Sequence, residues 1–160
     1  MTGTTTWTDR LRDLELSLPP VATPAGAYVP AVRTGNLVYT SGQLPLVDGV
    51  STCTGKLGVD VSVEDAAAAA RLCALNGLAA VDMLVGLDRV VRVVKIVGFV
   101  ASGPGFTLQP QVINGASDLL LDVFGGAGRH ARSAVGLAEL PRGCAVEVEF
   151  VFEIDGGGLS

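Results

Sequence analysis

Apolar residues follow two different spacings along this chain, and the spacing switches from strand-like to helix-like and back. Short runs rich in valine, isoleucine and aromatic residues predict β-strands, whereas apolar residues three and four positions apart predict helices. Strands are predicted at 28–33, 37–43, 89–101, 130–135 and 145–152. Helices are predicted at 6–16, 63–84 and 109–124.

The residues that bound these runs support the assignment. Pro30 cannot donate a hydrogen bond to a ladder, so the first strand is predicted at the edge of a sheet. The turn signal at 34–36 predicts a hairpin with the next run. Ser62 can cap the second helix and Gly86 can end it. The run at 89–101, dense in valine and isoleucine, is predicted to be a central strand.

The resulting order is helix, strand, strand, helix, strand, helix, strand, strand. This order predicts a single domain over 1–160 of the α+β class, with a short N-terminal helical extension at about 6–18. We expect a mixed sheet with two main helices packed on one of its faces. The other face would stay apolar and uncovered in one chain, which predicts an oligomer. The tail at 155–160 is glycine-rich and is predicted to fray.

Composition narrows the possible partners. Of the 160 residues, 49% are apolar and only 17% are charged, and the net charge of −5 argues against nucleic acid as a partner. No stretch of eighteen uncharged apolar residues occurs, so we expect no membrane span. The chain begins without the features of a signal peptide, which predicts a cytoplasmic protein. Its three separated cysteines should then be reduced, and with one histidine they predict no metal site.

Two charged residues interrupt the last two apolar runs. Arg132 stands in one and Glu147 in the other, with a turn at 139–143 between them. Strands joined by a turn can lie side by side, so we expect the two side chains to come close. An arginine binds a carboxylate through two hydrogen bonds, and a glutamate can handle protons, which predicts a site for a small carboxylic acid. A purely structural ion pair remains the alternative. The lone histidine, His130, is more often structural than catalytic.

Several short motifs then occur in the order typical of one family. They are Tyr28-Val29 after a Pro-x-Gly lead-in, Thr40-Ser41-Gly42-Gln43 with Pro45, Asn114 after Val112-Ile113, Ala131-Arg132-Ser133 with Val135, Leu140-Pro141, and Val146-Glu147-Val148-Glu149. Over about 24–154 the chain resembles the Rid family, the YjgF-like reactive intermediate (enamine/imine) deaminases. Its longer loops resemble a longer-chain branch of that family.

The resemblance implies a chorismate-mutase-like fold and a homotrimer with sites between subunits. It implies hydrolysis of 2-imino or 2-enamino acids to 2-oxo acids and ammonia, without a metal or organic cofactor. Arg132 would bind the substrate carboxylate, and Glu147 would position or activate water. The residues implied to line the site are Tyr28, Ser41, Gly42, Asn114 and Ala134. Ala134 stands where the family often has cysteine, and its backbone N–H could serve as well as that of cysteine.

Two other functions stay open. A non-catalytic or regulatory protein could bind a small carboxylate in the same inter-subunit cleft. An endoribonuclease is a second alternative, because this family has often carried that name, but a basic groove and a histidine pair are both missing from the sequence.

Overall fold

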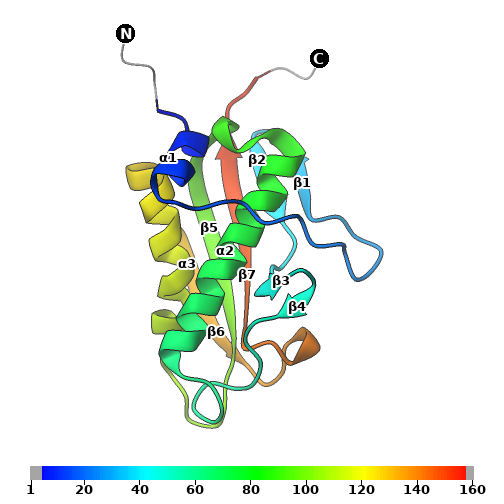
Figure 1. Ribbon diagram of the computed structural model, residues 1–160, viewed down its shortest axis with the longest axis vertical. Helices are drawn as coiled ribbons and strands as arrows, with labels where there is room; N and C mark the ends of the chain where they lie inside the picture. Colours follow the sequence, from blue (N-terminus) through cyan, green and yellow to red (C-terminus); the bar gives the residue numbers. More distant parts are fainter. Residues whose placement is uncertain (1–4, 158–160) are drawn as a thin grey trace.

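The computed structural model describes residues 5–157 and shows a sheet covered by helices on one side (Figure 1). The helices are α1 (Trp7–Asp13), α2 (Val63–Val85) and α3 (Gln109–Phe124), with 3-10 turns η1 (Leu87–Arg89), η2 (Gly125–Gly128) and η3 (Pro141–Gly143). The strands are β1 (Ala31–Thr34), β2 (Leu37–Thr40), β3 (Leu46–Val47), β4 (Val50–Ser51), β5 (Val90–Ala101), β6 (Ala131–Leu137) and β7 (Val146–Ile154). Residues 155–157 have no regular secondary structure, and the rest of the tail predicted to fray lies outside the described residues.

Five strands form the main sheet in the order β1-β2-β7-β5-β6. β5 and β6 run parallel, and the other neighbouring pairs are antiparallel, so the sheet is mixed as predicted. β1 is an edge strand and β5 an interior one, as expected. A small hairpin of β3 and β4 was missed in the predicted loop after β2. It turns at Asp48-Gly49, where both residues have positive φ angles of 50° and 78°.

The predicted contact between the last two strands is wrong. β6 and β7 are separated by β5, which pairs with both of them. The cause is the crossover: β6 follows β5 through α3, and a parallel neighbour reached through a helix takes one side of β5. The chain then crosses the end of β5 and returns as β7 on its other side.

Helices α2 and α3 pack together on one face of the sheet, where one glycine permits the close approach of the two helices and another permits that of α2 to the sheet. A Cβ atom built on Gly115 of α3 would lie 1.9 Å from the carbonyl oxygen of Ala67 in α2. A Cβ atom on Gly77 of α2 would lie 2.6 Å from the ring of Phe150 in β7. Larger side chains at these positions would push the layers apart. The alanine-rich sequence of α2 therefore serves close packing.

By length and composition, α2 is apolar enough to cross a membrane. The sequence rule based on uncharged stretches did not single it out. In the structure its apolar residues are used in the protein core. Ala66, Ala70, Cys73, Ala74, Leu78, Ala80 and Val81 are fully buried between the sheet and α3.

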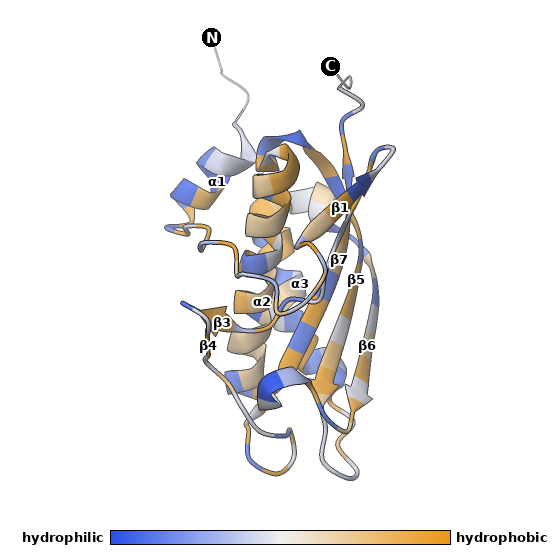
Figure 2. Cartoon of the chain, turned by 90° about the vertical axis from the view of Figure 1, so that its right-hand side faces the viewer, coloured by the Kyte–Doolittle hydropathy of each residue, from blue (hydrophilic) through white to orange (hydrophobic). Residues whose placement is uncertain are grey.

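The opposite face of the sheet carries no helix, as the edge-on view shows (Figure 2). Exposed apolar side chains on this open face are Val32, Tyr39, Val135 and Leu137. Carboxylates of β7 lie among them, so the face is less uniformly apolar than the sequence suggested. The three cysteines are all free thiols. These observations confirm the α+β prediction, with two main helices on one face and a short helix, α1, at the start.

Candidate functional site

Arg132 lies on the edge strand β6 and faces α3. Its register partner on β5 is Ile96, which is fully buried beneath the helices, and paired residues share a face of the sheet. The Nη1 group of Arg132 donates to Asn114 Oδ1 at 2.8 Å and to Ser117 Oγ at 3.1 Å. Within residues 5–157, its Nε and Nη2 groups have no protein acceptor. The edge of the guanidinium that bears these two donors can therefore bind a carboxylate bidentately.

Asn114, which the resemblance implies to line the site, lies beside the guanidinium of Arg132. It lies one helical turn before Ser117 on α3, so both side chains reach the same guanidinium. Its amide oxygen is engaged by Arg132, which makes it a support for the arginine. Sequence reasoning missed Ser117. Its spacing of three from Asn114 was the signal that could have found it.

His130 continues the same network. Its Nδ1 atom lies 2.6 Å from the carbonyl oxygen of Gly128, and its Nε2 atom lies 3.0 Å from Ser117 Oγ. The side chains of His130, Ser117 and Arg132 are thus linked in a row. His130, for which the sequence favours a structural role over a catalytic one, is therefore joined to the candidate carboxylate-binding arginine through one serine.

Ala134 lies two residues beyond Arg132 on the same face of β6. It pairs with Gly98 of β5 and is half-buried against the core. A small side chain fits here beneath α3. The structure thus brings Arg132, Asn114 and Ala134 to the helix-covered face of the sheet, together with Ser117 and His130.

Glu147 lies elsewhere, on the open face of the sheet. Glu147 pairs with Phe99 of β5, whereas Arg132 pairs with Ile96 of the same strand. Residues three positions apart on a strand point to opposite faces, so the side chains of Glu147 and Arg132 do so too. A Cβ atom built on Gly42 would lie 1.8 Å from Glu147 Oε1, so the carboxylate rests against the backbone of Gly42. Burial, and then the neighbouring charge of Glu149, raise the pKa of Glu147. A raised pKa makes the carboxylate a better proton acceptor.

One hollow lies beside the β1–β2 hairpin, just before β1 and just after β2. It is lined by Tyr28, Ser41 and Gly42 together with the segment 21–25. Ser41 Oγ donates to the carbonyl oxygen of Val29 at 2.7 Å, and Tyr28 Oη accepts from the backbone N–H of Ala25 at 3.2 Å. Tyr28 precedes β1 instead of starting it. The contact of Gly42 with Glu147 joins this group to the carboxylate.

The predicted site residues therefore fall into two groups within one chain. One group surrounds Arg132 beside α3, and the other surrounds Glu147 beside Gly42. The two groups lie on strands that are two spacings apart in the sheet, about 10 Å, and on opposite faces of it. The expectation that Arg132 and Glu147 lie close together in one chain is wrong, because β5 runs between their strands.

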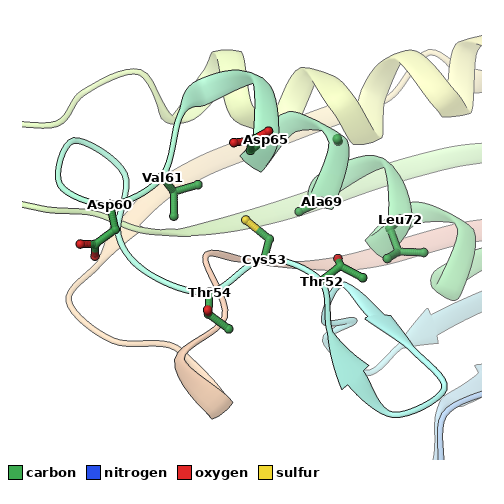
Figure 3. Close-up of a pocket in the computed structure, with 9 residues that line it drawn as sticks. Thr52, Cys53, Thr54, Asp60, Val61, Asp65, Ala69 and Leu72 are labelled. Atoms are coloured by element: carbon green, nitrogen blue, oxygen red, sulfur yellow. The ribbon is translucent and has the colours of Figure 1, made fainter.

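A separate hollow of about 630 Å³ lies at the start of α2 and contains none of the predicted residues (Figure 3). Figure 3 shows Asp60 on the loop before α2, Asp65 at the start of the helix, and the side chain of Cys53 extending toward the helix. Burial, and then the charge of Asp65, raise the pKa of Cys53, which disfavours a reactive thiolate. Among the described residues, no group of three or more histidine, cysteine or carboxylate side chains is placed to hold a metal ion.

Comparison with known proteins agrees with this architecture. Residues 8–152 match the family model described as "YjgF/chorismate mutase-like, putative endoribonuclease". Protein TCP17 of Trypanosoma cruzi is 50% identical over 91% of this chain and 92% of its own. A 2-iminobutanoate/2-iminopropanoate deaminase of Dermatophagoides farinae is 31% identical over 88% of this chain and 95% of its own.

A solved structure from Agrobacterium tumefaciens, of a protein with unknown function, has the same fold. It is 48% identical, covers 93% of this chain and 92% of its own, and superposes with a TM-score of 0.85. The matched family model spans nearly all of the sheet and both main helices. The chain therefore belongs to the YjgF/Rid family and has its chorismate-mutase-like α+β fold.

Proposed function

We propose that this protein hydrolyses small 2-imino or 2-enamino acids to 2-oxo acids and ammonia. The observation that carries the proposal is the guanidinium of Arg132. Its Nη1 group is held by Asn114 and Ser117, while its Nε and Nη2 edge has no acceptor among the described residues. Such an edge matches the two oxygens of a substrate carboxylate.

The chemistry needs little beyond orientation and a water molecule. With the carboxylate bound by Arg132, the electrophilic imine carbon is held in register. Glu147 accepts a proton from a water molecule as the water oxygen attacks the imine carbon, which gives a carbinolamine. The imine nitrogen takes up a proton as the carbinolamine forms. Glu147 then returns its proton to the nitrogen, the C–N bond breaks to release ammonia, and the hydroxyl group loses its proton to water as the C=O bond of the 2-oxo acid forms. An enamine first takes a proton at its β-carbon to become the imine.

A second copy of the chain is needed for this arrangement. Within one chain Arg132 and Glu147 face opposite sides of the sheet, so one ligand cannot meet both. The exposed apolar side chains of the open face supply a surface on which another subunit can pack. A homotrimer with sites between subunits, each using Arg132 of one copy and Glu147 of another, satisfies both requirements. The deaminase relative from Dermatophagoides farinae supports the same reaction class.

The test is turnover of 2-iminopropionate, produced in situ from alanine by an amino acid oxidase. Arg132→Ala should reduce ammonia release to the uncatalysed rate while the circular dichroism and the oligomer stay unchanged. Arg129→Ala is the matched control, because Arg129 is exposed and lies only three residues away. Equal turnover by Arg132→Ala and the parent protein would overturn the role of Arg132.

The separation of the two groups favours one further candidate, a non-catalytic protein that binds small carboxylates through Arg132. Calorimetry with pyruvate, run beside the deaminase assay, distinguishes the two. Binding without acceleration of ammonia release would identify the binding protein. Ribonuclease activity, named in the description of the family model, is disfavoured by the net charge of −5. RNA cleavage that disappears on further purification would exclude it.

A further inference from the structure

The row of hydrogen bonds behind Arg132 has a defined direction. A carbonyl oxygen only accepts, so the contact of 2.6 Å between His130 Nδ1 and Gly128 O places a proton on Nδ1. In the neutral ring Nε2 is then an acceptor, and Ser117 Oγ donates its proton to it over 3.0 Å. The lone pairs of Ser117 Oγ are left to accept from Arg132 Nη1 at 3.1 Å. The histidine thereby sets the orientation of the serine hydroxyl toward the arginine.

The histidine itself is held firmly. Gly128 is buried, and a Cβ atom built on it would lie 2.3 Å from the carbonyl oxygen of Leu120, so η2 presses directly on α3. This contact fixes the carbonyl group that accepts from His130. The glycine-rich segment at 125–128 takes no direct part in the proposed reaction, but it supplies the carbonyl group that fixes the imidazole ring of His130.

Ser117 is the buried link in this row. Its side chain belongs to a residue only 8% exposed, whereas Asn114 at the other side of the guanidinium is exposed. Water can replace the contact from Asn114 more easily than the one from Ser117. The side chain of Arg132 has several rotatable bonds and lies on an edge strand. A hydrogen bond to a buried partner is therefore needed to hold its guanidinium plane in one orientation.

We propose that His130 and Ser117 are positioning residues that orient the guanidinium of Arg132 for binding the substrate carboxylate. The inference rests on the proposed function, because it assigns the carboxylate to Arg132. Neither residue touches the reacting atoms, so their loss should weaken binding of the substrate and leave the chemical step nearly unchanged. The free edge of the guanidinium would then sample several directions.

The test compares KM and kcat in three variants. Ser117→Ala and His130→Phe should each raise KM for 2-iminopropionate, and Kd for pyruvate, by about tenfold, as expected for loss of one hydrogen bond to a charged group. The value of kcat should change by less than about twofold. His130→Gln can place an amide oxygen near the position of Nε2, so it should recover most of the affinity lost in His130→Phe. Ser17→Ala, on an exposed serine far from the site, is the control.

A merely structural role predicts a different result. Ser117→Ala and His130→Phe would then lower the melting temperature but leave KM and Kd at the parent values, and this outcome overturns the inference. So does a His130→Gln variant that binds no better than His130→Phe.

Failure of the proposed function can be recognised separately. If the parent protein neither releases ammonia nor binds pyruvate, the side-chain ¹⁵N order parameter of Arg132 Nε gives the answer. A parent value typical of a rigid group that falls in Ser117→Ala and His130→Phe supports positioning. Equal order parameters in all variants overturn it.

Discussion

The carboxylate of Glu147 rests directly on the backbone of Gly42, at a place where no side chain fits. A Cβ atom on Gly42 would lie 1.8 Å from Glu147 Oε1 and 2.8 Å from its Cδ atom. Gly42 belongs to the Thr-Ser-Gly-Gln segment after β2, and Glu147 belongs to β7. Two motifs more than a hundred residues apart in sequence therefore meet at the proposed proton acceptor.

Adding one methyl group at Gly42 should displace this carboxylate. We expect Gly42→Ala to lower kcat on 2-iminopropionate by about ten- to a hundredfold, because displacing a catalytic group by about 1 Å has effects of this size. Gly156→Ala is the control, since a Cβ atom there would make only an ordinary contact of 3.6 Å with Asn36. Steady-state kinetics and circular dichroism on both variants provide the measurement. Unchanged kcat in Gly42→Ala would show that the position of Glu147 does not limit the reaction.

The pKa of Glu147 should appear in the pH dependence of the reaction. Burial and the charge of Glu149 both raise this pKa, and the carboxylate must be ionised to accept a proton. The value of kcat/KM should therefore rise with pH through a midpoint above that of an ordinary glutamate. Glu149→Gln removes one of the two causes, so the midpoint should move to lower pH. Glu139→Gln, which removes a charge at an exposed position, should leave the midpoint in place.

The same pKa predicts an effect on stability. A carboxyl group whose pKa is raised by folding keeps its proton more tightly in the folded state, so its ionisation disfavours folding. This penalty is absent below the pKa of the unfolded chain, grows as pH rises through the folded pKa, and stays constant above it. Glu147→Gln should therefore raise the melting temperature at neutral pH, and this gain should vanish in acid. A gain of the same size at low pH would contradict burial of the charge as the cause.

Asn76 should support the loop that follows Gly42. Its Nδ2 group donates to the carbonyl oxygens of Leu44 at 3.0 Å and Leu46 at 3.2 Å, and the residue is 8% exposed. Asn76→Ala leaves two carbonyl groups without this donor, so the free energy of unfolding should fall by about 2–4 kcal/mol. Urea denaturation measures the loss. The exposed Gln111→Ala on α3 should change it by less than about 0.5 kcal/mol.

Oligomerisation through the open face should be sensitive to a new charge. Val135 is 43% exposed on that face of the single chain. If subunits pack there, the parent should show three times the 16.3 kDa mass of one chain in light scattering, and Val135→Glu should dissociate it and abolish turnover. Val59→Glu, at a loop residue that is 65% exposed, is the control. A trimer that survives Val135→Glu would place the interface elsewhere.

The sequence predicts several elements well because their signals are local. Helix α2 begins after Ser62, whose side chain accepts from the backbone N–H of Asp65, and ends at Gly86, as expected from the capping rules. Strand β5 covers nearly the whole valine-rich run. Residues 125–128, for which the sequence predicts neither a helix nor a strand, form a 3-10 turn that packs on α3, and packing is not a local signal.

The sequence by itself determined the main helices and strands, the α+β class and, through short motifs, the family to which the chain belongs. Only the tertiary structure decided where the charged residues stand. It placed β5 between β6 and β7, which sent Arg132 and Glu147 to opposite faces of the sheet. It also brought Ser117 and His130 behind the arginine. Hydrophobic spacing specifies which face of a strand is buried, but strand order depends on the path of the chain through its crossover, which no local pattern encodes.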